Sequence, residues 1–583
     1  MSLEVKKIKA ELCVIGGGIA GINVALTASR LGVKTILIHE RPVLGGNASG
    51  EIRMWVCGVK DYAYKETGIG EEINLENFYF NPTKNYNLWD ALLYNKVTSQ
   101  ENLTTLLNCT CFDAKCNGGS ISSVTAYQMT TQTLFEIQAT YFADCSGDSI
   151  LAPLSGAEFM YGRESQSEYG EVMQTHFEKD KCTMGNSVII QARQTAQKVP
   201  FKAPSWAEKV PVEKLKKKNV DLFNPEENFW YIELGGVDDV IGNAENINKR
   251  LVSLCLGIWD TIKNSGEWDA DNFELDFLGF LGAKRESRRL TGDYILTAND
   301  ILSATIFDDT VAYGGWPLDD HYPEGFDGDK GNYLIKVNKP YGIPYRCLYS
   351  KNITNLFFAG RNISATHMAL SSARVMGTCG IIGQAVGVAV SIAKKYGVMP
   401  REVNSYINEV QQTLLYNDCY LPEINREVSP LMKSIIPMQD SKQAVLFNGK
   451  DRNLSGENNL YKIKHGESIT YEFGTFIAVK EIKLVFDSDL ERKSYSLDTI
   501  HTQYATRSNT LNNSPIVSLP TTLVKKYKIT ITCEDGLIET VYNENYKRNV
   551  ILPINKKVKK VSLVVLENWG NTQESGVFTF ELK

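Results

Sequence analysis

Three glycines and one acidic residue near the N-terminus have the types and spacing that bind a dinucleotide. Gly16, Gly18 and Gly21 follow a short apolar run and open an Ala- and Leu-rich helical pattern, and Glu40 ends the next apolar run. Such glycines allow a tight turn, a close approach of backbone to pyrophosphate, and close packing of helix on strand. Glu40 is placed to accept hydrogen bonds from ribose hydroxyls, which favours FAD or NAD over NADP. The alternative is the same strand–helix–strand unit without a nucleotide.

A second glycine-rich segment, residues 377–387, is predicted to form a helix with small residues on one face. Its N-terminus, at Gly377 and Thr378, would present free N–H groups that can stabilise negative charge on a reduced flavin. The alternative is a tightly packed core helix.

Charged residues in 282–294 and 314–321 are the other candidates for chemistry. The first segment contains Arg285 within the run KRESRR, which is flanked by apolar residues. An arginine buried there would need a carboxylate or an anionic ligand, whereas a solvated basic face would need neither. The second segment carries His321 beside two aspartates, and a surface histidine without a function is the alternative.

The twelve cysteines form no C-x-x-C pair. Cys109, Cys111 and Cys116 lie together on a strand-like run, with no fourth ligand nearby, so we expect no metal site. We interpret the cysteines as small buried side chains in a reducing compartment, which favours the cytoplasm.

Apolar periodicity predicts the elements that position these residues. Strands at 12–15 and 33–38 flank a helix at 19–31, and a buried strand at 355–360 precedes the second glycine-rich segment. Further predictions are a helix at 88–96, strands at 103–110, 121–128, 134–139 and 141–146, and a helix at 401–416.

The same patterns predict an α/β fold with additional domains. The strand–helix alternation is lost between 160 and 345, where aromatic residues and proline are frequent, as is typical of a domain that covers a substrate. From about 444 short alternating strands indicate an all-β sandwich. The predicted domains are a dinucleotide-binding domain at 1–160 and 345–398, an α+β substrate domain at 161–344, a helical linker at 399–443, and the sandwich at 444–583.

Composition excludes several classes of protein. The chain has 583 residues, of which 43% are hydrophobic and 22% charged, as in ordinary globular proteins. A net charge of −6 disfavours nucleic acid or an anionic membrane as a partner. No apolar stretch is expected to span a bilayer, and no signal peptide is visible. A periplasmic location stays open if the first residues replace a removed signal.

Five motifs together resemble the FAD-dependent oxidoreductases of the glutathione-reductase-fold superfamily, in a branch common in carbohydrate-degrading bacteria. They are GGGIAG at 16–21, ERPVLGGNASGEIR at 40–53, DCSGD at 144–148, KRESRRLTGDY at 284–294, and the segment 355–387. The resemblance implies a Rossmann-like FAD domain with extended, non-covalent FAD. The residues that it implies around the cofactor are Gly16, Gly18, Ile19, Ala20, Gly21, Glu40, Arg41, Gly45, Gly46, Asn47, Ala48, Ser49, Cys111, Asp144, Gly147, Gly360, Arg361, Gly377 and Thr378.

A more distant similarity, to fumarate reductase and succinate dehydrogenase flavoproteins, concerns catalysis. In those proteins a substrate-binding histidine follows an Ala-Gly strand end by seven residues and an arginine comes later; His367 and Arg374 match this order. On this basis His367 is expected to be the catalytic base, with Arg374, Arg285 and His321 as further catalytic candidates. The longer spacing to Arg374 leaves its role open.

The tail resembles galactose-binding-like domains through the runs at 469–490 and 567–570. Such domains often bind glycans, and many only pack against their own enzyme, so both possibilities stay open.

These observations favour an enzyme that transfers a hydride between a small polar substrate and flavin N5, with a carbohydrate-derived compound as one candidate substrate. Two alternatives remain: a fumarate reductase-like enzyme acting on C–C bonds of a carboxylate, and a non-catalytic FAD-bound or glycan-binding scaffold. No second GxGxxG is apparent for NAD(P)H, so the electron acceptor is left unassigned.

Overall fold

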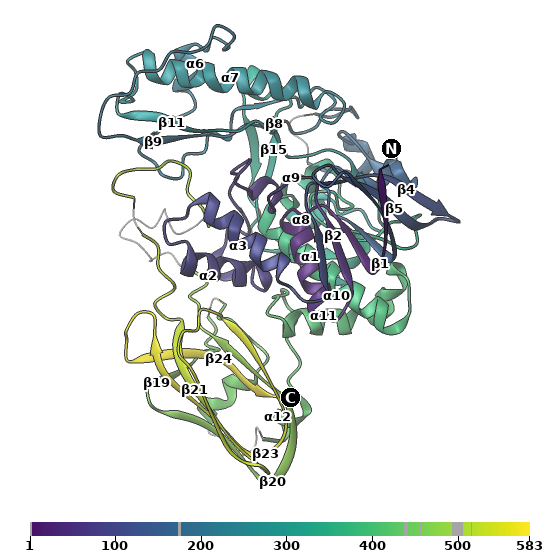
Figure 1. The fold of residues 1–583 in the computed structure, drawn as a ribbon, viewed down its shortest axis with the longest axis vertical. Helices are drawn as coiled ribbons and strands as arrows, with labels where there is room; N and C mark the ends of the chain where they lie inside the picture. Colours follow the sequence, from purple (N-terminus) through teal and green to yellow (C-terminus); the bar gives the residue numbers. More distant parts are fainter. Residues whose placement is uncertain (1–2, 173–175, 436–440, 455, 492–504, 515) are drawn as a thin grey trace. The chain divides into compact units, whose positions relative to one another are not determined.

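The computed structural model describes residues 3–172, 176–435, 441–454, 456–491, 505–514 and 516–583 (Figure 1). The chain divides into two compact units. The first comprises Met1–Lys60, Lys84–Gln411 and Tyr504–Pro515, and the second comprises Asp61–Thr83, Gln412–Gln503 and Ile516–Lys583. Residues 61–83 and 412–435 group with the C-terminal strands in this division, and the domain bounds predicted from the sequence stay a prediction.

A seven-stranded sheet organises the first unit. Its order is β3-β2-β1-β6-β5-β4, with β18 also paired to β6. The strands are β1 (Glu4–Ile15), β2 (Thr35–Ile38), β3 (Leu103–Leu106), β4 (Cys109–Asn117), β5 (Ser120–Gln128), β6 (Thr133–Asp144) and β18 (Leu356–Phe358). Pairing is parallel from β3 through β6 to β18, and antiparallel at β4 and β5.

The register of the parallel strands places three loops at one edge of the sheet. Ile15 of β1 and Phe358 of β18 both lie opposite Asp144 of β6. The loops that begin at Gly16, Cys145 and Ala359 therefore start side by side, at the edge where parallel sheets bind ligands.

Helices α1 (Ile19–Arg30) and α10 (Met376–Tyr396) pack against each other through glycines. A Cβ atom at Gly383 would lie 2.3 Å from the Ala20 carbonyl oxygen, and one at Gly387 would lie 2.5 Å from Thr27 Cβ. The small residues of the second glycine-rich segment thus serve close helix contact.

We expect Gly383→Ala to lower the thermal unfolding midpoint, because the added methyl group must push α10 away from α1. A matched control is Gly70→Ala in helix α2 (Ile69–Phe80), where nothing lies within 4 Å of the added Cβ. Scanning calorimetry of both variants checks this, and an equal midpoint for Gly383→Ala and wild type would contradict the packing argument.

Helix α10 is long and apolar enough to cross a membrane, with a mean hydropathy of 1.6 over an 18-residue window, of which 83% is buried inside the protein. The sequence predicts no membrane span, and this helix meets the criterion by length and composition alone. Its burial against α1 is that of a core helix, and such a helix is weak support for a membrane span.

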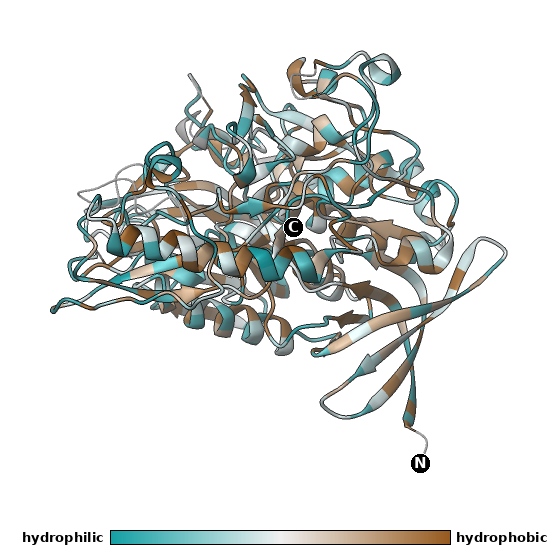
Figure 2. Cartoon of the chain, turned by 90° about the horizontal axis from the view of Figure 1, so that it is seen from above, coloured by the Kyte–Doolittle hydropathy of each residue, from teal (hydrophilic) through white to brown (hydrophobic). Residues whose placement is uncertain are grey.

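The segment between the two halves of the sheet contains small sheets and one long helix. Helix α7 (Ala244–Asn264) buries Ile247, Leu251, Leu254, Ile258 and Ile262 on one face. Helices in Figure 2 carry both hydrophobic and hydrophilic bands, as expected for amphipathic helices. The strands of this segment that concern the site are β8 (Asn186–Ser187), β10 (Glu233–Leu234), β12 (Ala283–Lys284), β15 (Leu318–His321) and β16 (Asn332–Ile335). The helices that flank the site or the sheet are α3 (Tyr86–Thr98) and α9 (His367–Ala373).

The second unit contains one six-stranded antiparallel sheet of order β19-β24-β20-β23-β21-β22. Its strands are β19 (Tyr461–Lys464), β20 (Ser468–Phe486), β21 (Val524–Cys533), β22 (Gly536–Tyr542), β23 (Asn549–Asn568) and β24 (Glu574–Leu582). Helix α2 and α12 (Pro430–Ile435) belong to this unit, and Leu75 and Phe78 of α2 join its hydrophobic core. The β-rich character agrees with the sequence prediction, while a galactose-binding-like identity stays a prediction.

Candidate functional site

The loop after β1 builds the first wall of a cavity of about 670 Å³. Gly16 has φ +106°, and a Cβ there would lie 2.4 Å from the Cys145 carbonyl oxygen. A Cβ at Gly21 would lie 1.8 Å from the Gly16 carbonyl oxygen. These two glycines are thus required by the turn and by helix–strand packing, as the motif predicts.

Gly18 has a different role, because its missing side chain opens the cavity. It lines the cavity and has an extended backbone (φ −71°), and the nearest atom to an added Cβ is Gly46 Cα at 3.9 Å. Gly45 donates its N–H to Gly17 O at 2.8 Å, which brings the second glycine pair against the first. Bare backbone therefore forms a cradle at the start of α1.

The N-terminus of α1 has nothing of its own to satisfy its first N–H groups. Gly18 supplies no side-chain cap, and the first turn contains no acidic residue. Ile19 and Ala20 of this turn line the cavity. Unsatisfied N–H groups and the helix dipole favour an anionic group at this position.

A charged network closes the wall contributed by the β6 and β18 loops. Arg361 donates to Asp148 Oδ1 at 2.8 Å and to Ser287 Oγ at 3.0 Å, and Lys284 donates to Asp148 Oδ2 at 2.5 Å. Burial opposes ionisation of Asp148, but the charges of Arg361 and Lys284 hold the pKa of this carboxyl well below its usual range. Asn47 joins this network by donating to Lys284 O at 3.1 Å.

The far end of the cavity holds a histidine paired with a buried carboxylate. His321 Nδ1 lies 2.7 Å from Glu233 Oε2, and His321 Nε2 lies 3.4 Å from Asp319 Oδ2. Glu233 also accepts the Gly185 N–H at 2.8 Å and lies 3.3 Å from Arg285 Nη1. Burial opposes its ionisation, but the charges of Arg285 and His321 keep its pKa below the usual range.

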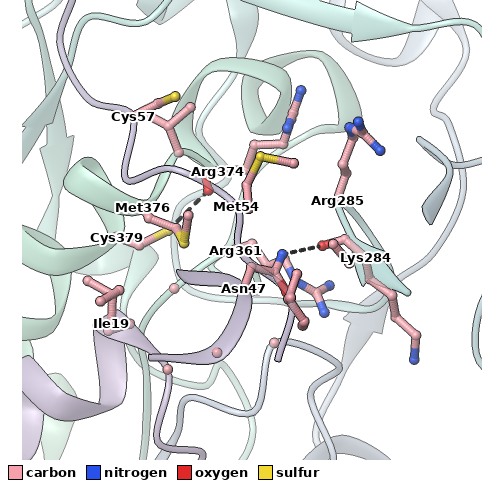
Figure 3. Close-up of a pocket in the computed structure, with 18 of the residues that line it drawn as sticks. Ile19, Asn47, Met54, Cys57, Lys284, Arg285, Arg361, Arg374, Met376 and Cys379 are labelled. Atoms are coloured by element: carbon pink, nitrogen blue, oxygen red, sulfur yellow. Dashed lines mark hydrogen bonds between the residues drawn. The ribbon is translucent and has the colours of Figure 1, made fainter. Parts of the chain in front are cut away.

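Arginines and indoles complete this end. Arg374 Nη2 lies 3.3 Å from Asp319 Oδ2, and Arg374 Nε is buried with no hydrogen-bond partner among the described residues. Figure 3 shows Arg285 and Arg374 together at one end of the cavity, away from Ile19 at the start of α1. The indoles that line the cavity belong to Trp55, Trp230 and Trp316.

The cavity brings together most of the residues that sequence reasoning assigned to it. Those that line it are Gly16, Gly18, Ile19, Ala20, Glu40, Arg41, Gly45, Gly46, Asn47, Gly147, Gly360 and Arg361, together with Arg285, His321 and Arg374. Gly21, Ala48, Ser49, Cys111, Asp144, Gly377, Thr378 and His367 are not among the lining residues.

Physical reasons account for several of these exclusions. Gly21 serves packing, and Cys111 is buried within β4. Asp144 accepts the N–H groups of Ser146 and Leu151, so it shapes the loop rather than facing the cavity. The sequence predicts a free N–H at Gly377, but this group donates to Cys57 O at 2.7 Å. Met376 and Cys379 line the cavity instead of Gly377.

His367 lies in a buried ionic network behind the cavity. Its Nδ1 lies 2.8 Å from Glu286 Oε2 and its Nε2 lies 2.9 Å from Asp320 Oδ1, and the ring is 1% exposed. Burial opposes the charge, yet Glu286 and Asp320 raise the pKa of His367 to about 10. An imidazolium with both nitrogens engaged has no lone pair to accept a substrate proton, so this geometry does not provide the expected base.

Two residues that sequence reasoning missed had recognisable signals. Glu233 is the one acid in the otherwise apolar run 229–234, and Asp148 is the charged end of a strand–loop motif. A carboxylate inside an apolar run is costly unless it is paired, which Glu233 is. Among the described residues no group of three or more His, Cys, Asp or Glu side chains is arranged to hold a metal ion.

The cavity fits FAD on features of this structure. The Gly18 backbone leaves room where any larger residue would project a side chain, and the uncapped N-terminus of α1 suits a pyrophosphate. Residues 11–414 match the family described as FAD dependent oxidoreductase. The chain belongs to this family. The match covers more than half of the chain and includes every cavity-lining residue named above, so the protein is an FAD-dependent oxidoreductase with a Rossmann-like α/β fold.

Comparison with solved structures gives only distant likeness. A structure of E. coli quinol fumarate reductase FrdA is 11% identical, with a TM-score of 0.28 and coverage of 70% of this chain and 74% of that one. OxyS anhydrotetracycline hydroxylase from Streptomyces rimosus is 11% identical, with a TM-score of 0.32 and coverage of 69% and 66%. The p-nitrophenol 4-monooxygenase PnpA from Pseudomonas putida DLL-E4 is 11% identical, with a TM-score of 0.31 and coverage of 74% and 92%. No curated protein matches the chain.

We expect Gly18→Val to weaken FAD binding at least tenfold while the apoprotein stays folded. Gly18 lines the cavity, and the Cβ atom of the new residue would lie 3.9 Å from the nearest protein atom, Gly46 Cα, so we expect the loss to fall on the ligand. Flavin content after purification, FAD titration of the apoprotein and its unfolding midpoint check this. Full flavin occupancy at wild-type affinity would contradict the cradle.

Proposed function

We propose that the protein oxidises a C–OH group of a small polar substrate and that His321 accepts the hydroxyl proton. The observation that carries this proposal is one continuous cavity lined by the glycine cradle at one end and by His321, Arg285 and Arg374 at the other. FAD, when bound, supplies the two-electron redox chemistry. The chain's own residues bind and orient the substrate and take up its proton.

The hydrogen bonds around His321 support its role as base. Glu233 accepts the Nδ1–H, which leaves the lone pair on Nε2. The 3.4 Å separation of Nε2 from Asp319 is long for a hydrogen bond, so a substrate hydroxyl can approach Nε2. Once His321 is protonated, Asp319 and Glu233 stabilise the imidazolium.

The rest of the wall is suited to holding a polar substrate. Arg285 is anchored to Gly185 O at 3.1 Å and Trp230 O at 3.0 Å, so its position is defined before a ligand arrives. Trp230 and Trp316 line the cavity, and indole rings supply apolar contact area of the kind that sugar rings use. These features support a carbohydrate-derived substrate.

A second candidate is reduction of a C–C double bond in a carboxylate. The unpartnered Nε of Arg374 favours it, because a buried guanidinium donor without an acceptor is suited to an anionic ligand.

Anaerobic mixing of the holoprotein with two substrate panels tests both candidates. Sugars, polyols and hydroxy acids should bleach the oxidised flavin band if the first proposal holds. Reoxidation of pre-reduced flavin by α,β-unsaturated acids would support the second instead. A flavin that answers to neither panel, with glycan affinity elsewhere in the chain, would support a non-catalytic scaffold.

A further inference from the structure

Strand β15 separates the cavity from the buried network that contains His367. All four of its residues are buried, and successive side chains of a strand point to opposite faces. Asp319 and His321 line the cavity, whereas Asp320, between them, accepts a hydrogen bond from His367. One face of β15 therefore presents Asp319 and His321 to the cavity, and the other face is hydrogen-bonded to His367 through Asp320.

The segment that supplies Arg285 is held in the same way. Arg285 lines the cavity, and the next residue, Glu286, is fully buried and bonds His367 Nδ1. Arg289 also bonds Glu286, so this carboxylate is fixed from two directions. Burial opposes its ionisation, but His367 and Arg289 hold the pKa of Glu286 below its usual range.

The third segment is α9 itself. His367 is the first residue of this helix, and Arg374 is the residue at its C-terminal cap. The His367 backbone N–H donates to Glu164 Oε2 at 2.8 Å, which fixes the start of the helix. The His367 side chain therefore contacts the segments that carry Arg285 and His321, and its own helix, α9, carries Arg374 at its end.

We propose that His367 is a positioning residue that sets the mutual placement of Arg285, His321 and Arg374 by bridging Glu286 and Asp320. This inference rests on the proposed function for what the three side chains do, but not for where they lie. Sub-ångström placement matters at such a site, because misplaced reactants lose rate steeply. The charged imidazole suits the bridge, since only its protonated form donates from both nitrogens.

The test compares His367→Gln with wild type and with a control, Asp309→Asn. Asp309 is a buried carboxylate of the same unit that pairs with Arg346 at 2.9 Å and does not line the cavity. The first readout needs no substrate: ring N–H signals of ¹⁵N-histidine-labelled holoprotein, which has only six histidines. A spectrum of His321→Asn identifies the His321 signal.

We expect the hydrogen-bonded Nδ1–H signal of His321 to move in His367→Gln and to stay in place in Asp309→Asn. With any panel compound that reduces the flavin, kcat should fall about 10- to 100-fold in His367→Gln. Flavin content should be unchanged. The conservative substitution Asp320→Asn keeps an acceptor for His367. It should therefore change the His321 signal and kcat less than His367→Gln does.

Distinct results overturn the inference. An unmoved His321 signal, or unchanged kcat and KM in His367→Gln, would remove the positioning role. Complete loss of turnover with the His321 signal in place would instead make His367 the base. If His367→Gln does not give folded holoprotein, Asp320→Asn decides by the same two readouts. If no panel compound reduces the flavin, the proposed function fails, while the histidine spectra still test the placement.

Discussion

Replacing His321 with asparagine should slow flavin reduction by substrate about 10²- to 10⁴-fold, because a general base contributes that much to proton transfer. FAD content should stay at the wild-type level, since His321 lies at the opposite end of the cavity from the glycine cradle. Asparagine can still fill part of the space beside Glu233, so a packing loss is limited. Anaerobic single-turnover absorbance measures the reduction step directly.

Two further variants make this result specific. Glu233→Gln keeps the shape but removes the charge that fixes the Nδ1–H tautomer, so it should give an intermediate rate. His465→Asn is the matched control: this histidine lies in the second unit and bonds Ser575 Oγ at 2.9 Å. If substrate reduces the flavin of His321→Asn at the wild-type rate, His321 is not the base. That result would favour the second candidate, in which Arg374 binds a carboxylate substrate.

The sequence predicts the dinucleotide-binding half well because its signals are local. The glycines at 16–21 act within one turn, and the φ of Gly16 and the contact at Gly21 are what the motif requires. Strand boundaries were harder to predict. The predicted break at residue 140 is absent, since β6 runs through it from Thr133 to Asp144 and pairs with β1 on both sides of this residue. Long-range pairing overrides the weak local break.

The second unit shows the same effect more strongly. The sequence predicts short strands after about residue 444, whereas β20 runs without a break from Ser468 to Phe486 and pairs with β23 across register shifts. Residues 61–83 were assigned to the first domain by their place in the chain, yet α2 contributes Leu75 and Phe78 to the core of the second unit. No local pattern reveals which of two cores a helix will join.

The site could be predicted only in part, for the same physical reason. Burial of Arg285 indicates a need for a carboxylate, but Glu233, the carboxylate that meets it, lies 3.3 Å away in space and 52 residues away in the chain. The resemblance led to His367 by its spacing from Gly360. It could not reveal that Glu286 and Asp320 occupy both ring nitrogens, because those contacts come from two other segments.

Raising the pH from about 7 to 10 should destabilise the wild-type protein more than His367→Gln. The folded-state pKa of His367 is raised to about 10, above its unfolded value near 6.5, by Glu286 and Asp320 against the cost of burial. The resulting stabilisation is fully present below about pH 6.5 and is lost as pH rises toward 10, because the unfolded chain releases the proton first. Its size is on the order of a few kcal/mol for a shift of this extent.

Comparing wild type with His367→Gln isolates the contribution of His367 from groups whose effect on the free energy of unfolding changes with pH in the opposite direction. Lys483 in the second unit is buried, and burial lowers its pKa to about 8, so its effect on stability favours the folded state as pH rises above that value. Lys483 is present in both proteins, so its effect cancels in the stability difference between wild type and His367→Gln. Calorimetric unfolding of each holoprotein at pH 6, 7, 8, 9 and 10 measures the difference in stability. At pH 6–7 the unfolding midpoint of wild type should be well above that of His367→Gln, because the variant leaves Glu286 and Asp320 without their shared cation. The gap should narrow steadily toward pH 10. A gap that is constant across this range would show that His367 is not held as an imidazolium, and the bridge between the two cavity-lining segments would then need a neutral hydrogen-bonding explanation.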